Sequence, residues 1–167
     1  MKYTLKLFII TLSLISFAST ATDSFNVYLV RHAEKQKNSD DPSLTRCGAF
    51  RASQLSDIFS NVELSTVYST RYQRTMDTAS PTALAKKLGI KQYAPGGLEQ
   101  LARVIKQNKQ NVLVVGHSNT TPELASLLID EKVAKMDDSE YRHLFQIQFH
   151  GDKATLVRLT QPLTCKH

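Results

Sequence analysis

The sequence has no apolar run long enough to span a membrane and no cluster of basic residues interleaved with aromatic ones. Its longest apolar stretch, from Leu7 to Ala18, holds about a dozen residues, whereas a membrane-spanning helix needs roughly 20. The 21 Lys and Arg residues are spread along the chain, which disfavours nucleic-acid binding. The formal net charge of +6 is better interpreted as attraction toward an anionic substrate.

Cysteine is nearly absent, since the chain has only Cys47 and Cys165. Neither lies in a Cys-x-x-Cys motif, which disfavours a redox or a zinc-binding role. In an exported protein two lone thiols are more often paired than free, so we predict a disulfide between them. Such a bond closes a long loop and is worth up to about 4–5 kcal/mol by loop entropy, although engineered examples often give less.

The start of the chain has the pattern of a cleaved signal peptide. Two lysines form a basic start, the apolar stretch follows, and small residues place the cleavage after Ala18 or Ala21. A buried N-terminal helix is the alternative interpretation. No cysteine lies near the cleavage site to carry a lipid, so we expect no stable membrane anchor after cleavage. The sequence therefore predicts a signal peptide over residues 1–21, one domain over residues 22–167, and a periplasmic or secreted location.

Short apolar stretches alternate with stretches of helical periodicity along the rest of the chain. The expected strands cover residues 25–30, 66–68, 90–93, 111–115, 144–149 and 154–159. The expected helices cover residues 45–60, 74–88, 97–108 and 121–129. Thr45 and Thr121 are the expected N-caps of the first and last helix, and Pro81 is expected to interrupt the second. This order predicts a three-layer α/β/α sandwich with a mostly parallel central sheet of five to six strands.

Three of the expected strands are followed by residues that suit phosphoryl transfer. Arg31 and His32 end the first strand, Arg74 comes shortly after the second, and His117 follows the strand at residues 111–115. Because the carboxyl ends of parallel strands meet at one edge of a sheet, we expect these four side chains to converge. Guanidinium groups bind phosphate oxygens in bidentate pairs. Neighbouring arginines should also lower the pKa of His32 and keep the ring neutral, as a nucleophile requires.

These residues lie in three motifs that resemble those of the histidine phosphatase superfamily, the group that includes the cofactor-dependent phosphoglycerate mutases. The motifs are LVRHAEK at residues 29–35, YSTRYQRTMDTA at residues 68–79 and VGHSNT at residues 115–120. They occur in the same order as in the family, and the resemblance extends over nearly the whole of the predicted domain.

The resemblance implies a role for each residue. His32 would be the phosphorylated nucleophile, Arg31 and Arg74 would bind the phosphoryl oxygens, and His117 would donate to them from the other side. Asn119, in the third motif, is taken as a further substrate contact. Among the arginines of the second motif, Arg74 fits the family pattern better than its neighbour three residues earlier.

Two departures from the family pattern bear on the reaction. Many members have Gly where Ala33 stands. Mutases and large acid phosphatases also carry a long insertion that holds substrate contacts and usually a carboxylate proton donor, whereas only residues 80–110 separate the second motif from the next expected central strand. The resemblance therefore implies a short phosphatase with an open site, not a mutase. Glu34 is the expected proton donor and Glu99 the weaker candidate, while an ordinary surface position is the alternative for both.

We therefore expect an exported phosphatase that acts on a small phosphorylated compound or an envelope sugar through a covalent phosphohistidine on His32, with no metal and no cofactor. One alternative is a phosphate-binding or inactive relative, which would not need both His32 and His117. Another is a metal enzyme built on these two histidines and Glu34, which would lack a third firm ligand and the Cys-x-x-Cys companion of zinc deaminases. No residue in the sequence indicates which phosphorylated compound is the substrate.

Overall fold

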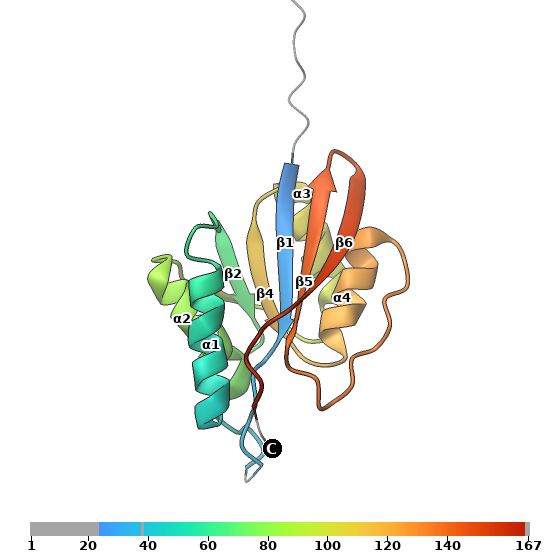
Figure 1. Cartoon of the computed structure of the whole chain (residues 1–167). Coiled ribbons are helices and arrows are strands. Elements are labelled where there is room, and N and C mark those ends of the chain that lie inside the picture. Colours follow the sequence, from blue (N-terminus) through green and yellow to red (C-terminus); the bar gives the residue numbers. More distant parts are fainter. Residues whose placement is uncertain (1–23, 38, 166–167) are drawn as a thin grey trace, which may run out of the picture.

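The computed structural model describes residues 24–37 and 39–165 as one six-stranded sheet with helices on both faces (Figure 1). The strands are β1 (Ser24–Arg31), β2 (Thr66–Ser69), β3 (Ile90–Gln92), β4 (Val112–Gly116), β5 (His143–His150) and β6 (Lys153–Thr160). The helices are α1 (Arg46–Ile58), α2 (Gln73–Ala85), α3 (Leu98–Asn108) and α4 (Thr120–Ile129). None of these helices is both long and apolar enough to cross a membrane. The expected signal peptide lies outside the described residues.

The strand order is β3-β2-β4-β1-β5-β6, and the first four strands in this order are parallel. β5 and β6 form an antiparallel hairpin that pairs with β1. The expected α/β/α sandwich with a mostly parallel sheet is thus confirmed. In the register of the parallel strands, Arg31 lies beside Gly116 and Ser69 lies beside Val115. The chain therefore leaves β1, β2 and β4 at the same edge of the sheet, which is the lower edge in Figure 1.

Apolar residues fill both faces of the sheet because successive side chains of a strand point to opposite sides. In β1, Val27 and Leu29 pack with residues of α3 and α4, whereas Tyr28 and Val30 pack with residues of α1 and α2. β4 is buried along its whole length, as expected for a central parallel strand. This two-sided core fixes the sheet edge on which the polar side chains gather.

One expected feature of the helices is confirmed, and two others, at Pro81 and at the start of α4, differ from expectation. Thr45 is the N-cap of α1, as expected, and its hydroxyl accepts a hydrogen bond from the backbone N–H of Gly48 at 3.0 Å. The expected interruption at Pro81 is wrong: α2 runs through it, and packing of α2 against α1 outweighs the lost hydrogen bond. The N-cap of α4 is Asn119 and not Thr121, which is buried in the first turn and whose hydroxyl donates to the carbonyl of Val30 at 3.3 Å.

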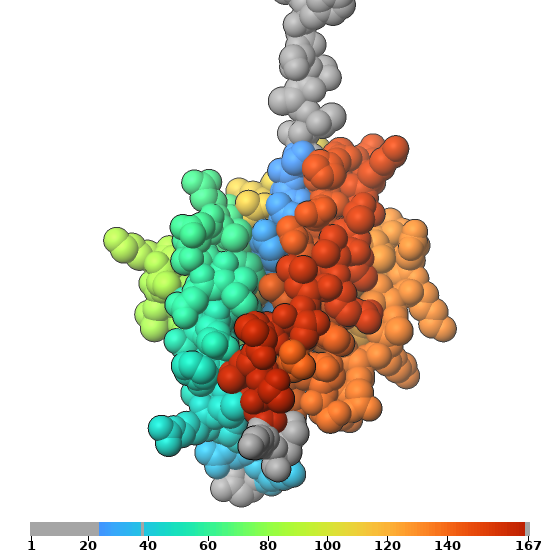
Figure 2. Space-filling model, in the orientation of Figure 1, coloured from blue at the N-terminus to red at the C-terminus, as the bar shows by residue number. Residues whose placement is uncertain are grey.

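The C-terminal tail crosses from β6 to α1, where Cys165 forms the expected disulfide with Cys47. Figure 2 shows this tail lying between α1 and the hairpin of β5 and β6. The bond joins residues 118 positions apart and so ties the last described residues to the helix that follows the first strand.

Candidate active site

Both histidines of the motifs lie at the carboxyl edge of the parallel strands. His32 follows β1 and His117 follows β4, and their ring centroids are 5.6 Å apart. The backbone N–H of His32 donates to the carbonyl of Gly116 at 2.9 Å, so the pairing of β1 with β4 continues into the site itself. The two rings are therefore positioned by the most central pair of strands in the sheet.

The ring of His32 is buried and oriented by the backbone. Its Nδ1 lies 2.8 Å from the carbonyl oxygen of Ala33, which can only accept, so Nδ1 carries the proton and Nε2 has a free lone pair. Burial, together with the positive charges of Arg31 and Arg74, lowers the pKa of His32 to about 3, against the opposing effect of the hydrogen bond to Ala33. His32 is consequently neutral at physiological pH, as a nucleophile must be.

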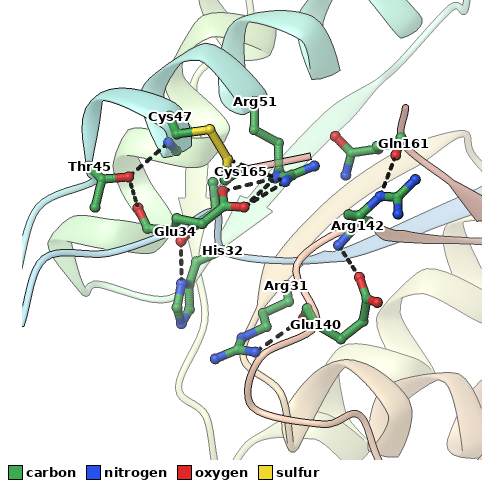
Figure 3. Close-up of polar contacts among 12 residues, drawn as sticks. Arg31, His32, Glu34, Thr45, Cys47, Arg51, Glu140, Arg142, Gln161 and Cys165 are labelled. Atoms are coloured by element: carbon green, nitrogen blue, oxygen red, sulfur yellow. Dashed lines mark hydrogen bonds and ion pairs between the residues drawn. A yellow bond between two sulfur atoms is a disulfide. The ribbon is translucent and has the colours of Figure 1, made fainter. Parts of the chain in front are cut away.

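Arg31 is held in place by the segment that precedes β5. Its Nη1 donates to the backbone carbonyls of Asp138 at 2.8 Å and Glu140 at 3.1 Å, and more weakly to that of Asp137 (Figure 3). Its guanidinium also stacks over the ring of Tyr141, with Cζ 4.1 Å from the ring centroid. The sequence motifs did not indicate this role for the segment. Every residue has a backbone carbonyl, so the ones that accept from Arg31 cannot be recognised from the residue types in the sequence.

Arg74 enters the site from the first turn of α2. Its guanidinium lies over the ring of Tyr72, 4.5 Å from the centroid, and its Nη1 forms an ion pair with Asp41 at 3.5 Å. Asp41 also accepts from the backbone N–H of Gln73 and so caps the helix that carries Arg74. Asp41 was not expected here, because it is far from the second motif in sequence and lies in a polar loop.

His117 is oriented by a hydroxyl chain from the second motif. Its Nε2 lies 3.0 Å from Oγ1 of Thr70, which lies 2.8 Å from Oγ1 of Thr75. The ring also contacts Tyr72 edge-on, with centroids 5.3 Å apart. Burial, and then the charges of Arg74 and Arg31, lower the pKa of His117 to about 4. Both imidazoles are thus neutral. The positive charges of Arg31 and Arg74 lie beside them, which favours binding of a dianionic ligand.

Thr78, near the end of the second motif, links two parts of the site by hydrogen bonds. Its Oγ1 accepts from the backbone N–H of Ala33 at 2.9 Å and donates to the carbonyl of Arg74 at 2.7 Å. One buried hydroxyl therefore joins the segment that follows His32 to the helix that carries Arg74. A side-chain hydrogen bond of this kind is invisible in sequence, although the threonine itself lies within the motif.

Glu34 does not extend toward the two histidines, which corrects its expected role as proton donor. Its carboxylate accepts from Nε of Arg51 at 2.9 Å and from Nη2 as well, and both side chains are buried. Figure 3 shows the carboxylate pointing toward α1, away from the ring of His32. The close approach of α1 depends on Gly48, where an added Cβ would lie 2.2 Å from the carbonyl oxygen of Glu34. Glu34 therefore joins β1 to α1. The weaker candidate, Glu99, is exposed on α3 and pairs with Arg103.

Asn119 lies near the site but at its outer edge. It is exposed at the start of α4, and its side chain makes no capping hydrogen bond. With Ser118 it lines a hollow of about 470 Å³ whose other wall holds Lys135, Asp137 and Asp138. Hydrogen bonds from Ser139 lower the pKa of Asp137, which therefore stays ionised near neutral pH and cannot serve as a proton donor.

Within the described residues, no group of three His, Cys, Asp or Glu side chains could hold a metal ion. The metal alternative needed the carboxylate of Glu34, which Arg51 engages instead. Two neutral imidazoles, two oriented guanidinium groups and a free Nε2 are the parts of a phosphoryl-transfer site.

Comparison with known proteins agrees with a phosphoryl-transfer site. The model of the histidine phosphatase superfamily (branch 1) matches residues 27–94, which contain the first two motifs. No curated protein matches the sequence. The expected resemblance to this superfamily is confirmed over residues 27–94.

Solved structures with the same fold include the protein histidine phosphatase SixA in complex with tungstate, with a TM-score of 0.65 and 16% identity over 81% of this chain and 96% of that one. An alpha-ribazole phosphatase from Shigella flexneri has a TM-score of 0.68 and 17% identity over 81% of this chain and 96% of its own. A mycobacterial glucosyl-3-phosphoglycerate phosphatase has a TM-score of 0.66 and 11% identity, covering 84% of this chain and all of that one. At such identities the likeness concerns the fold.

Proposed function

We propose that this protein is an exported phosphatase that removes phosphate from a small phosphorylated compound or an envelope sugar through a covalent phosphohistidine on His32. The observation that carries the proposal is the orientation of His32. Its Nδ1 is occupied by the carbonyl of Ala33, so Nε2 is the nitrogen available to attack phosphorus. A binding module would need the arginines but no oriented nucleophile.

The two arginines are incompletely satisfied, which supports a bound phosphoryl group. The Nε atoms of Arg31 and Arg74 are both buried and have no hydrogen-bond partner among the described residues. Donors of this kind are costly when they remain unpaired. An arriving phosphoryl group would draw the two guanidinium groups toward its oxygens and supply the missing acceptors, which is a gain available only with substrate present.

The reaction has two steps. In the first, the lone pair of Nε2 of His32 forms a bond to phosphorus while the bond from phosphorus to the leaving group breaks, and the charge on the transferring oxygens is stabilised by Arg31, Arg74 and His117. The leaving group departs with the bonding electrons. In the second, a water oxygen forms a bond to the same phosphorus while the bond from phosphorus to Nε2 breaks and its electron pair returns to Nε2. The water gives up a proton to solvent, inorganic phosphate is released, and the neutral ring of His32 is restored.

The substrate class follows from what protonates the leaving group. An alkoxide is a poor leaving group unless an acid protonates it. Glu34 is engaged by Arg51, and Asp137 stays ionised, so neither provides that proton. We therefore favour substrates whose leaving group is already stable, such as aryl phosphates, acyl phosphates, sugar 1-phosphates and phosphoramidates.

Export is supported by two features of the chain. Residues 1–21 have the pattern of a signal peptide, and the Cys47–Cys165 disulfide is typical of proteins that fold in an oxidising compartment. Mass spectrometry of the protein recovered from a cell fraction would locate the mature N-terminus, which we expect after Ala18 or Ala21. Recovery of the uncleaved chain in the cytosol would contradict export.

The mechanism is tested by trapping the intermediate. Brief reaction with a phosphate-labelled aryl ester should leave label on the protein that is lost in acid and retained in alkali, as expected for a P–N bond. His32→Ala should abolish both labelling and turnover. His150→Ala is the matched control, because His150 is exposed and pairs with Ser24 at the opposite edge of the sheet. Label that survives acid, or turnover by His32→Ala at the wild-type rate, would refute the phosphohistidine.

A further inference from the structure

A second hollow is lined in part by Tyr72, whose ring also contacts His117. It has a volume of about 410 Å³ and is lined by Arg71, Tyr72, Gln92, Tyr93, Ala94 and Pro95. Its residues come from the second motif and from the end of β3, and the reaction described above uses none of them directly. Its composition is unusual for a surface depression, because two tyrosine rings and a proline surround one cation.

Tyr72 joins this hollow directly to the phosphoryl site. The ring that lines the hollow also contacts His117, with centroids 5.3 Å apart, and supports the guanidinium of Arg74 at 4.5 Å. A phosphoryl group held by His117 and Arg74 therefore lies within about one tyrosine side chain of the hollow. The part of a substrate that leaves can pass along Tyr72 into it.

The charge of the hollow is set by Arg71. This side chain is exposed, and in the described part of the chain it has no ion-pair partner, whereas Arg74 pairs with Asp41 and Arg51 with Glu34. It is Arg74, and not Arg71, that stacks over the ring of Tyr72 where this ring contacts His117. Arg71 is therefore an exposed cation beside the site, with no ion-pair partner among the described residues.

The hollow beside Arg31 has a mixed charge, since Lys135 lines it together with Asp137 and Asp138. There Asp137 and Asp138 form part of the wall next to Arg31. An anionic group on the leaving part of a substrate would meet two carboxylates there, whereas the lining of the second hollow contains Arg71 and no acidic residue. The second hollow therefore suits a substrate that carries a second negative charge better than the first.

The walls around Arg71 are fixed before any ligand binds. The hydroxyl of Tyr93 donates to the carbonyl of Val115 at 3.2 Å, and its backbone N–H donates to the carbonyl of Ser69 at 3.0 Å. The ring of Tyr72 is held between His117 and Arg74. A preformed pocket loses little conformational entropy when a ligand enters, so the cation can contribute to selectivity.

We propose that this hollow is a subsite for an anionic group on the leaving part of the substrate, bound by Arg71 between the rings of Tyr72 and Tyr93. The substrate is then a phosphomonoester that carries a second acidic group, either a carboxylate or another phosphate. This inference rests on the phosphatase function proposed above. A carboxylate presents two oxygens to the planar guanidinium, which is the geometry that arginine binds best.

The test compares two phosphate esters of the same ring, 4-carboxyphenyl phosphate and 4-carbamoylphenyl phosphate. They have nearly the same shape, but only the first carries a second negative charge near neutral pH. We expect kcat/KM for the carboxylate to exceed that for the amide roughly tenfold or more, which corresponds to about 1.4 kcal/mol of differential binding. The amide is the better leaving group of the two, so electronic effects alone give the opposite order.

Arg71→Gln should remove most of the preference by lowering kcat/KM for the carboxylate ester roughly tenfold, while the amide ester changes less than about twofold. Arg71→Lys should restore part of the preference, because it returns the charge but not the bidentate geometry. Arg103→Gln is the matched control, since Arg103 is an exposed arginine on α3. An equal loss for both esters would place Arg71 in the phosphate clamp and overturn the proposal, as would no loss for either.

A binding measurement separates this proposal from the reaction itself. Isothermal titration with 4-carboxyphenylphosphonate and 4-carbamoylphenylphosphonate makes the same comparison without turnover. Tighter binding of the carboxylate in wild type, lost in Arg71→Gln, would uphold the subsite even in a protein that hydrolyses neither ester. Equal binding of the two phosphonates would refute the subsite while leaving the phosphatase function intact.

Discussion

The carboxylate of Glu34 is bound by the guanidinium of Arg51, with Nε 2.9 Å from Oε2, and both side chains are buried at the junction of β1 and α1. Glu34 follows the nucleophile by two residues and so occupies the place where a proton donor is expected from sequence. The pairing gives it a different task. It fixes α1 against the segment that carries His32, close to the disulfide, since Nη2 of Arg51 also lies 3.6 Å from Sγ of Cys165.

Arg51→Met should lower the free energy of unfolding by about 3–5 kcal/mol, because it leaves the buried carboxylate of Glu34 without a partner. Urea denaturation monitored by circular dichroism measures the change. The double variant Glu34→Gln, Arg51→Met should recover part of the loss, because no buried charge remains. Arg103→Met is the control for an exposed pair and should cost about 0–1 kcal/mol. A loss as small as that control would show that the pair is not a structural element.

The pairing of Glu34 with Arg51 also predicts how kcat/KM depends on the leaving group. Without an acid at Glu34, kcat/KM should fall steeply as the leaving-group pKa rises across a series of aryl and alkyl phosphates. Glu34→Gln should keep this slope, whatever it does to stability. A shallow slope in wild type that becomes steep in Glu34→Gln would reinstate Glu34 as the proton donor.

Thr70→Val should lower kcat/KM roughly tenfold, or about 1.4 kcal/mol, because it removes the hydroxyl that orients His117. Thr82→Val is a close control. Thr82 is also a buried threonine, but its hydroxyl has no hydrogen-bond partner, so its replacement should leave activity and stability unchanged. Steady-state kinetics on an aryl phosphate measures the difference in kcat/KM between Thr70→Val and Thr82→Val. Equal activity of the two variants would show that the hydroxyl chain does not position His117.

Stability should fall as the pH drops below 6.5. His32 and His117 stay neutral in the folded protein down to pH values of about 3 and 4, whereas in the unfolded chain they take up protons below their ordinary pKa of 6.5. The unfolded state therefore binds more protons in this window, and each histidine costs roughly 2 kcal/mol between pH 7 and pH 5. Denaturation in phosphate-free buffer measures the loss. His32→Gln should remove about half of this contribution, and an unchanged pH slope in that variant would contradict it.

Reduction of the Cys47–Cys165 bond should lower stability by up to about 4–5 kcal/mol, since the bond restricts a long loop in the unfolded chain. Comparing thermal unfolding with and without reductant measures the loss. The double variant Cys47→Ala, Cys165→Ala should reproduce it and should no longer respond to reductant. If wild type and the double variant unfold alike under oxidising conditions, the bond contributes nothing to stability.

Gly116→Ala should destabilise the protein by about 1–3 kcal/mol through overpacking. An added Cβ would lie 2.8 Å from Oγ1 of Thr120 and 2.9 Å from the hydroxyl of Tyr93. Gly96→Ala is the control, since nothing lies within 4 Å of a Cβ at that position. Thermal unfolding of both variants tests the contrast, and equal midpoints would show that the close packing beside His117 relaxes without cost.

The order of strands and helices, the parallel central sheet and the convergence of His32, Arg74 and His117 could be predicted from the sequence. Each of these depends on local information. Apolar strands such as β4 have a distinctive composition, and parallel strands place their carboxyl ends at one edge, whatever the details of packing. The disulfide was also predictable, because two cysteines allow only one intramolecular pairing.

The partners of the site residues were decided by tertiary structure alone. The carbonyls that hold Arg31 come from a segment more than a hundred residues away, and backbone acceptors have no sequence signature. The direction of Glu34 was set by the close approach of α1 at Gly48 and by Arg51, neither of which lies in a motif. The sequence by itself determined which groups meet at the sheet edge. Long-range packing decided which of them face one another at this edge and which hold the others in place, because side-chain direction depends on contacts between elements distant in the chain.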